Sequence, residues 1–281
     1  MVQVNSMHKR SSRLLTCGLF ICSVLCLAFP STGFMAEPEA KTAGFAAADH
    51  AFMSLEYEKA DSLYNSMRKS YPDNADVFWK TARLNVSIAE AISPNDAARR
   101  MPYYTKAVDY ARKAVAIDST NSAAHTWLAA SLAVKSDRIG TKEKLARAKE
   151  IKRELDKALA LNPHDDVAWS ILGSYYHQIS KIGWMKRIIG NTFVGKMPEG
   201  NPQAAEHAFK KAISLNPRAI RHYHELALLY IDERREQEAL HILEVALKKP
   251  ILMKSDARRL EDIRVLIRKL SETDDTPPSS I

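Results

Sequence analysis

The sequence predicts an all-α fold in which helical hairpins stack side by side. The main observation is a repeated segment: residues 158–163 read ALALNP, and residues 212–217 read AISLNP. Each segment is followed by an aromatic-rich stretch with helical spacing, at 169–176 and at 223–230. Glycine is scarce, at 9 of 281 residues, and 46% of the residues are apolar, which is enough for a packed core.

The packing residues follow the tetratricopeptide (TPR) pattern, a helical hairpin of about 34 residues. Its packing positions recur with the helical period, and small residues at two of them let neighbouring helices approach closely. One repeat fills every position: Trp169, Leu172, Gly173, Tyr176, Ala205, Phe209, Ala212 and Pro217. Another repeat follows it: Tyr223, Leu226, Ala227, Tyr230, Ala239, Leu243 and Ala246. We therefore predict a TPR-like right-handed superhelix.

The repeats are expected in sequence order at about 41–74, 75–121, 122–165, 166–219 and 220–253. Residues 255–271 form a final amphipathic helix that we expect to cap the end of the stack. Together these segments make 37–271 one helical domain. Residues 272–281, which include Pro277 and Pro278, are predicted to be a disordered tail.

The three middle repeats are longer than the pattern requires, and their extra residues fall between the first helix (A) and the second helix (B) of each hairpin. Stacking aligns those turns along one edge of the superhelix. The insertions therefore either build a functional edge or simply lengthen the helices.

Residues 1–36 have the features of a targeting segment. Lys9, Arg10 and Arg13 precede the apolar stretch 14–29, which is shorter than the roughly 20 residues of a membrane span. We predict either a cleaved secretory signal or a retained N-terminal membrane anchor. The chain would then be exported, in the periplasm or another extracytoplasmic compartment, or membrane-anchored. In a eukaryote it would lie on the cytoplasmic face of an organelle membrane.

Two segments carry a more specific resemblance. Residues 140–148 read GTKEKLARA and precede Ile151 and Lys152, and residues 183–189 read GWMKRII and precede Phe193. With Trp127 and Phe209, these segments resemble the regulator of microtubule dynamics family of TPR proteins over about 76–270. The resemblance implies a non-enzymatic helical domain, association with microtubules and organelle membranes, and phospholipid binding in part of the family. The N-terminus looks like a bacterial export signal; in a bacterium tubulin could not be the partner, whereas lipid handling would remain.

The inner face of the helix A row is the predicted ligand groove. Its expected lining is Trp79, Arg83, Val86, Thr126, Ala130, Ser170, Ser174, His177, His224 and Leu228. These residues are mostly small or apolar, and only Arg83 and Arg221 offer a positive charge to a peptide carboxylate. The lining therefore favours an acyl chain or an amphipathic helix, unless these residues only pack the superhelix.

The insertion at 181–200 combines basic and apolar residues. A partner-facing role is predicted for Lys181, Trp184, Lys186, Arg187, Phe193 and Lys196. One interpretation is a membrane-facing lid, with its cations on lipid phosphates. The other is a segment whose aromatic residues join the core and whose charges are solvated.

No sequence motif for catalysis is present. The chain has no Gly-rich phosphate loop, HExxH or GxSxG motif, and its three cysteines all lie at 17–26. We expect no enzymatic activity, no cofactor and no metal. The net charge of +8 is too diffuse to indicate nucleic acid. The sequence favours a binding module for phospholipid or an acyl chain at an anionic membrane surface. The alternative is a protein–protein scaffold, which in a eukaryote would include microtubule association.

Overall fold

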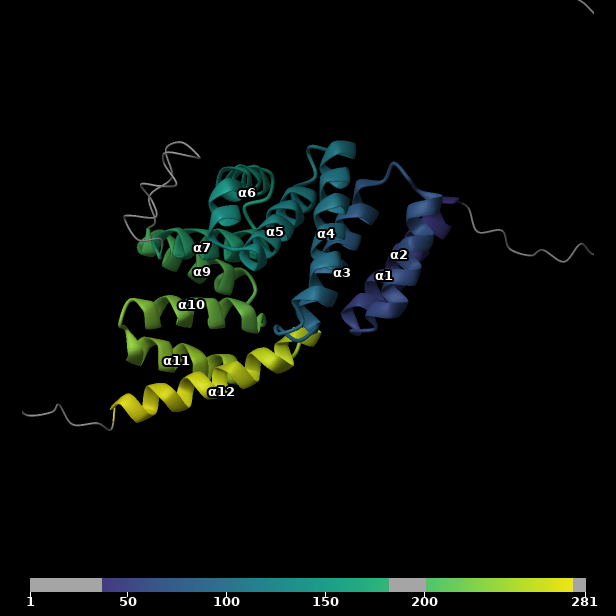
Figure 1. The fold of residues 1–281 in the computed structure, drawn as a ribbon. Helices are drawn as coiled ribbons and strands as arrows, with labels where there is room; N and C mark the ends of the chain where they lie inside the picture. Colours follow the sequence, from purple (N-terminus) through teal and green to yellow (C-terminus); the bar gives the residue numbers. More distant parts are fainter. Residues whose placement is uncertain (1–36, 182–200, 275–281) are drawn as a thin grey trace, which may run out of the picture. The chain divides into compact units, whose positions relative to one another are not determined.

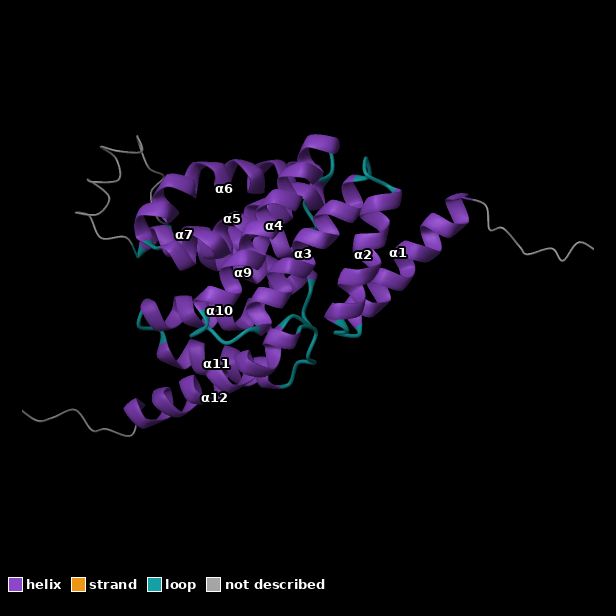
Figure 2. Ribbon diagram, turned by 45° about the vertical axis from the view of Figure 1, so that its right-hand side comes forward, coloured by secondary structure: helices purple, strands orange, loops and turns teal. Residues whose placement is uncertain are grey.

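The computed structural model describes residues 37–181 and 201–274. Every regular element in these residues is an α-helix, and they contain no strand (Figures 1 and 2). The helices are α1 Glu37–Met53, α2 Tyr57–Ser70, α3 Ala75–Ala91, α4 Ala97–Ile117, α5 Ser122–Ile139, α6 Thr141–Leu161, α7 Asp166–Ser180, α9 Pro202–Leu215, α10 Ile220–Asp232, α11 Glu236–Leu247 and α12 Lys254–Asp274. The all-α prediction is confirmed.

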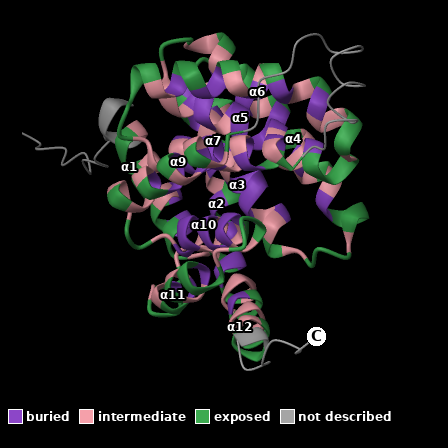
Figure 3. Ribbon diagram, turned by 90° about the vertical axis from the view of Figure 1, so that its left-hand side faces the viewer, coloured by how far each residue is buried: buried purple, intermediate pink, exposed green. Residues whose placement is uncertain are grey.

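Consecutive helices in the described part of the chain pack as hairpins: α1 with α2, α3 with α4, α5 with α6, α7 with α9, and α10 with α11. The helix A row continues from hairpin to hairpin, because α3 contacts α5, α5 contacts α7, and α7 contacts α10. Buried residues gather where the helices face one another (Figure 3). This arrangement is the predicted superhelix of stacked hairpins.

The repeated segment that ends in Asn-Pro is a helix-ending turn. The backbone N–H groups of Asn162 and Asn216 donate to the carbonyl oxygens of Ala158 and Ala212, at 2.8 and 2.9 Å. Each asparagine side chain then accepts a hydrogen bond from the backbone nitrogen two positions later, at 3.0 and 3.3 Å. Asparagine is favoured at such positions because its side chain replaces the hydrogen bonds that the ending helix no longer supplies.

Gly173 on α7 lies where α7 and α9 approach each other closely. A Cβ atom at this position would stand 2.6 Å from the ring of Phe209, far inside contact distance. Phe209 itself is fully buried. The small residue that the TPR pattern requires here is therefore needed to admit the Phe209 ring.

The extra residues of the second and third repeats lengthen helices. In these repeats α3 has 17 residues, α4 has 21, α5 has 18 and α6 has 21, whereas α10 and α11 have 13 and 12. Gly140 alone separates α5 from α6, and its φ of 124° lies in a region that favours glycine. The sequence left open whether the extra residues build a functional edge or lengthen the helices. In the second and third repeats they lengthen the helices. The insertion of the fourth repeat lies largely outside the described residues.

The last helix, α12, does more than cap the final hairpin. It packs on α11 and α10 through the fully buried Ile263, and it also contacts α3 in the second hairpin (Figure 1). The helix extends to Asp274, past the predicted start of the tail at residue 272. The start of α12 thus reaches across the inner side of the helix A row.

Several predictions concern residues that the structure does not describe. The predicted signal or anchor at 1–36 and Trp184, Lys186, Arg187, Phe193 and Lys196 of the insertion lie outside the described residues. Within the described part of the chain, no helix is both long enough and apolar enough to cross a bilayer.

Candidate functional site

A cavity of about 650 Å³ lies along the inner side of the helix A row, a size within the range of small-molecule sites. The A helices α3, α5, α7 and α10 form its walls, and the segment 252–259 at the start of α12 covers part of it. Apolar side chains from α3, α5 and α7 make its floor: Trp79, Val86, Trp127, Ala130, Val134, Ile171 and Ile179.

The cavity carries more charge than the sequence predicted. Its basic residues are Arg83, Arg138, Lys144, Arg221 and Arg259, and its acidic residues are Glu90, Asp137, Asp165, Asp166, Glu225 and Asp256. The prediction that Arg83 and Arg221 supply the only positive charge is therefore wrong. It considered helix A positions alone, whereas Arg259 comes from α12, and Arg138 from an extension of α5 beyond the usual repeat.

Glu90 is the centre of a polar cluster at the end of α3. Its carboxylate is 2.6 Å from Arg100 Nη2 and accepts a hydrogen bond from Tyr104. Burial raises the pKa of Glu90, but the Tyr104 hydrogen bond and the charge of Arg100 together bring that pKa below its usual value. The backbone carbonyl oxygen of Glu90 accepts a hydrogen bond of 2.7 Å from Arg258 on α12. This cluster therefore fixes α12 against α3 beside the cavity.

Two arginines at the cavity have no carboxylate of their own. Arg138 and Arg221 make no hydrogen bond or ion pair through their side chains within residues 37–181 and 201–274. Arg259 is paired with Asp256 at 2.6 Å, and burial together with the charge of Arg221 lowers the pKa of Arg259. The charges of Asp256, Glu225 and Glu90 act on Arg259 in the opposite direction, so this part of the cavity holds charges of both signs.

Several buried polar atoms at the cavity have no hydrogen-bond partner. They are Arg83 Nε, Ser170 Oγ, Tyr175 Oη and His222 Nδ1. Burial raises the pKa of Tyr175 to about 12, so its hydroxyl keeps its proton at neutral pH. Unsatisfied buried groups are uncommon in folded proteins, and a ligand is one explanation for them.

Six of the predicted groove residues line this cavity: Trp79, Arg83, Val86, Ala130, Ser170 and Ser174. Thr126 and His177 are instead buried between helices. The Thr126 hydroxyl donates to Asp165 at 2.7 Å, and His177 Nε2 lies 2.8 Å from Asp232.

His224 and Leu228 on α10 are also outside the cavity lining. Burial lowers the pKa of His224, and the charges of Arg259 and Asp262 on α12 also act on it. The last helix thus covers the part of α10 where His224 lies, and α10 presents Arg221, His222 and Glu225 to the cavity instead. The sequence prediction included Arg221 but missed His222 and Glu225, because it placed α12 only at the end of the stack.

Lys181 is the one predicted residue of the insertion that the structure describes. It follows α7 directly, and its Nζ lies 2.6 Å from Asp232 Oδ2. Asp232 also contacts His177, so the start of the insertion is held against the end of α10.

A family model described as "Regulator of microtubule dynamics protein 1-3" matches residues 45–271. The chain belongs to the regulator of microtubule dynamics family. The mouse regulator of microtubule dynamics protein 1 is 29% identical to this chain over 172 residues, which are 61% of this chain and 55% of the mouse protein. The protein 1 of Caenorhabditis elegans is 24% identical and covers 80% of this chain and 98% of its own length. The match to the human protein 2 is 27% identical and covers 79% of this chain and 54% of the relative. The chain therefore spans about half the length of the mammalian relatives.

Solved structures show the same fold at low identity. A thermophilic TPR protein of Thermus thermophilus superposes with a TM-score of 0.57 at 16% identity, over 82% of this chain and 98% of that protein. The pilF protein of Pseudomonas aeruginosa superposes with a TM-score of 0.50 at 18% identity, over 84% of this chain and 90% of that protein. The predicted TPR-like fold is therefore confirmed.

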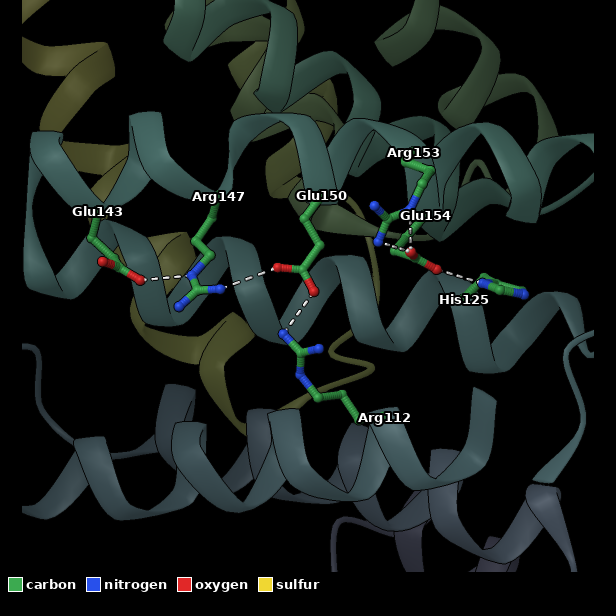
Figure 4. A network of polar contacts seen from close by, with 7 residues as sticks. All are labelled: Arg112, His125, Glu143, Arg147, Glu150, Arg153 and Glu154. Atoms are coloured by element: carbon green, nitrogen blue, oxygen red, sulfur yellow. Dashed lines mark hydrogen bonds and ion pairs between the residues drawn. The ribbon is translucent and has the colours of Figure 1, made fainter. Parts of the chain in front are cut away.

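The segment 140–148, which first pointed to the regulator of microtubule dynamics family, starts α6 and ties it to its neighbours (Figure 4). Arg147 bridges Glu143 at 2.8 Å and Glu150 at 3.3 Å, and Glu150 pairs with Arg112 of α4 at 2.6 Å. Further along α6, Glu154 lies 2.6 Å from His125 of α5 (Figure 4). Within the segment, Lys144 Nζ lies 2.5 Å from Asp137 of α5, and only Lys144 and Ala148 of the segment line the cavity.

No group of His, Cys, Asp and Glu side chains suited to hold a metal ion occurs in the described residues. The arrangement at the cavity can bind a ligand through its apolar and its charged lining residues. Its polar residues are mostly engaged in contacts that hold the helices together.

Proposed function

We propose that this domain is a non-catalytic binding module whose cavity holds an amphipathic anion, a phospholipid or a fatty acid, at a membrane surface. The observation that carries the proposal is a cavity with many apolar lining residues and with Arg138 and Arg221, whose side chains form no ion pair within residues 37–181 and 201–274. Apolar side chains such as Trp79 and Trp127 would remove an acyl chain from water. The guanidinium groups would bind its phosphate or carboxylate through charge-assisted hydrogen bonds.

Native mass spectrometry of the chain purified from cells, followed by solvent extraction, tests this proposal. We expect a bound phospholipid or fatty acid in about one copy per chain. Arg221→Glu should lower the lipid occupancy at least about tenfold, since it replaces a cation at the cavity with an anion. Arg268→Glu is the matched control, because Arg268 is exposed on α12 and does not line the cavity. The proposal would be overturned if the purified chain carried no lipid and also took up none from vesicles.

A second candidate function is protein binding. The names of the relatives connect them with microtubule dynamics, and TPR-like folds offer extended surfaces to protein partners. On α6, Lys142, Lys149 and Lys157 are exposed and have no side-chain ion pair in the described part of the chain. An acidic protein surface would suit these lysines. Co-sedimentation of the chain with microtubules, compared between the native protein and a Lys142→Glu/Lys149→Glu/Lys157→Glu variant, tests this candidate.

A further inference from the structure

Two neighbouring A helices, α7 and α10, together form one wall of the cavity. His222 Nε2 on α10 lies 2.9 Å from Asp166 Oδ2 on α7, and Ser174 Oγ lies 3.3 Å from Glu225 Oε2 further along both helices. Ser170 is one helical turn from both Asp166 and Ser174. Ser170 therefore shares a face of α7 with Asp166 and Ser174, which contact His222 and Glu225 of α10, and all five residues line the cavity.

This wall offers hydrogen-bond acceptors that the protein does not use. Ser170 and His222 are 1% and 3% exposed, and neither Ser170 Oγ nor His222 Nδ1 has a partner. Because an ionised carboxylate can only accept, the His222 tautomer that suits this contact donates from Nε2 to Asp166 and has an acceptor lone pair on Nδ1. A buried polar atom without a partner is unfavourable, so a donor from a ligand would stabilise both groups.

Glu225 adds a negative charge to the same wall. Its one hydrogen bond in the described residues comes from Ser174, although a carboxylate can accept about four. Arg259 acts on Glu225 through its charge, but it forms its ion pair with Asp256. A cationic donor would therefore find an available carboxylate beside two unused acceptors.

Arg221 lies one turn before Glu225 on α10, so both side chains share a helix face. Arg221 has no carboxylate partner among the described residues and lines the same cavity. The wall therefore presents a cation and an anion side by side, which suits a ligand group with both charges. A primary ammonium has three N–H donors, one for each of the three residues Glu225, Ser170 and His222.

We propose that the cavity selects phospholipids whose headgroup carries a primary amine, with the ammonium on Glu225, Ser170 and His222 and the phosphate on Arg221. This inference rests on the lipid-binding function proposed above. A quaternary ammonium has the same charge but no N–H donor, so it leaves the acceptors of Ser170 and His222 without partners. The site thus distinguishes phosphoethanolamine from phosphocholine headgroups.

The test uses the full chain and vesicles with equal amounts of phosphatidylethanolamine and phosphatidylcholine of identical acyl chains. The lipid that remains bound after separation from the vesicles is extracted and quantified. We expect phosphatidylethanolamine to be enriched, and its N-methylated and N,N-dimethylated forms to bind progressively less. Glu225→Gln and Ser170→Ala should each reduce the ethanolamine-to-choline ratio, with a change of roughly tenfold for Glu225→Gln.

Glu244→Gln is the matched control, because Glu244 is an exposed acid on α11 that does not line the cavity. Equal binding of the two lipids by the native protein would overturn the headgroup assignment and leave lipid binding intact. An unchanged ratio in Glu225→Gln would also overturn it. Absence of every lipid would instead contradict the proposed function itself. The methylation series uses only the native protein, so it tests the assignment even where a variant fails to fold.

Discussion

Arg258 donates a hydrogen bond of 2.7 Å to the backbone carbonyl oxygen of Glu90, although the two residues are 168 positions apart in the sequence. A second hydrogen bond, of 3.2 Å, joins Arg258 to the carbonyl oxygen of Ile92. Both carbonyl groups lie at the end of α3, where a helix leaves acceptors without internal partners. Through this contact the last helix closes one side of the cavity.

Removal of the Arg258 side chain should destabilise the domain. We expect Arg258→Ala to lower the free energy of unfolding by about 2 kcal/mol, because two carbonyl groups lose a charged donor. Urea unfolding followed by circular dichroism measures the change. Arg268→Ala, on the exposed side of the same helix, should change the free energy of unfolding by less than about 0.5 kcal/mol. Equal changes in the free energy of unfolding for the two substitutions would contradict the claim that Arg258 holds the last helix against α3.

Gly173 should not tolerate a methyl group. Gly173→Ala places a Cβ atom 2.6 Å from the Phe209 ring, and overpacking of this kind costs about 1–3 kcal/mol. Thermal unfolding should show a lower midpoint for this variant. A matched control is Gly44→Ala on α1, where the new Cβ would meet Met67 at 3.5 Å, an ordinary contact distance. The double variant Gly173→Ala/Phe209→Leu should unfold at a higher temperature than Gly173→Ala alone, since the smaller leucine side chain removes the clash.

We expect the domain to become less stable at acid pH because Glu206 is then protonated. The hydrogen bond from Arg235, at 2.5 Å, is the main cause that lowers the pKa of Glu206 to about 2, from an ordinary value of 4.5. A carboxyl group with a lowered pKa contributes stability above its unfolded pKa and loses that contribution as the pH falls through its folded pKa. The free energy of unfolding should therefore decrease between about pH 4.5 and pH 2. Glu206→Gln should make the free energy of unfolding depend less on pH in this range. Glu244→Gln, at an exposed residue, should leave the pH dependence unchanged.

The local parts of the fold could be predicted from sequence because their causes are local. Asn162 and Asn216 form the same helix-ending turn within their own neighbourhoods, and Gly173 was expected at a close helix contact before Phe209 was seen against it. The family also followed from short segments such as 140–148. Each of these signals depends on residues that are near one another in the chain or on a fixed repeat spacing.

The candidate site depends on contacts that no local pattern encodes. The position of α12 across the helix A row brings Arg259 and Asp256 to the cavity and covers the part of α10 that holds His224. It follows from the contact between Arg258 and Glu90, which joins the last helix to the second hairpin across 168 positions of the sequence. The sequence contains both residues but gives no sign that they meet.

The most direct test of the account is the lipid occupancy of a variant whose cavity is filled. Ala133 lies on α5 and lines the cavity, so Ala133→Trp would occupy the space that an acyl chain needs. Ala146→Trp on the exposed face of α6 is the control of equal size. Native mass spectrometry after purification from cells should show bound lipid in the native chain and in Ala146→Trp, and little or none in Ala133→Trp. Bound lipid at the native level in a folded Ala133→Trp protein would contradict the claim that this cavity is the lipid site.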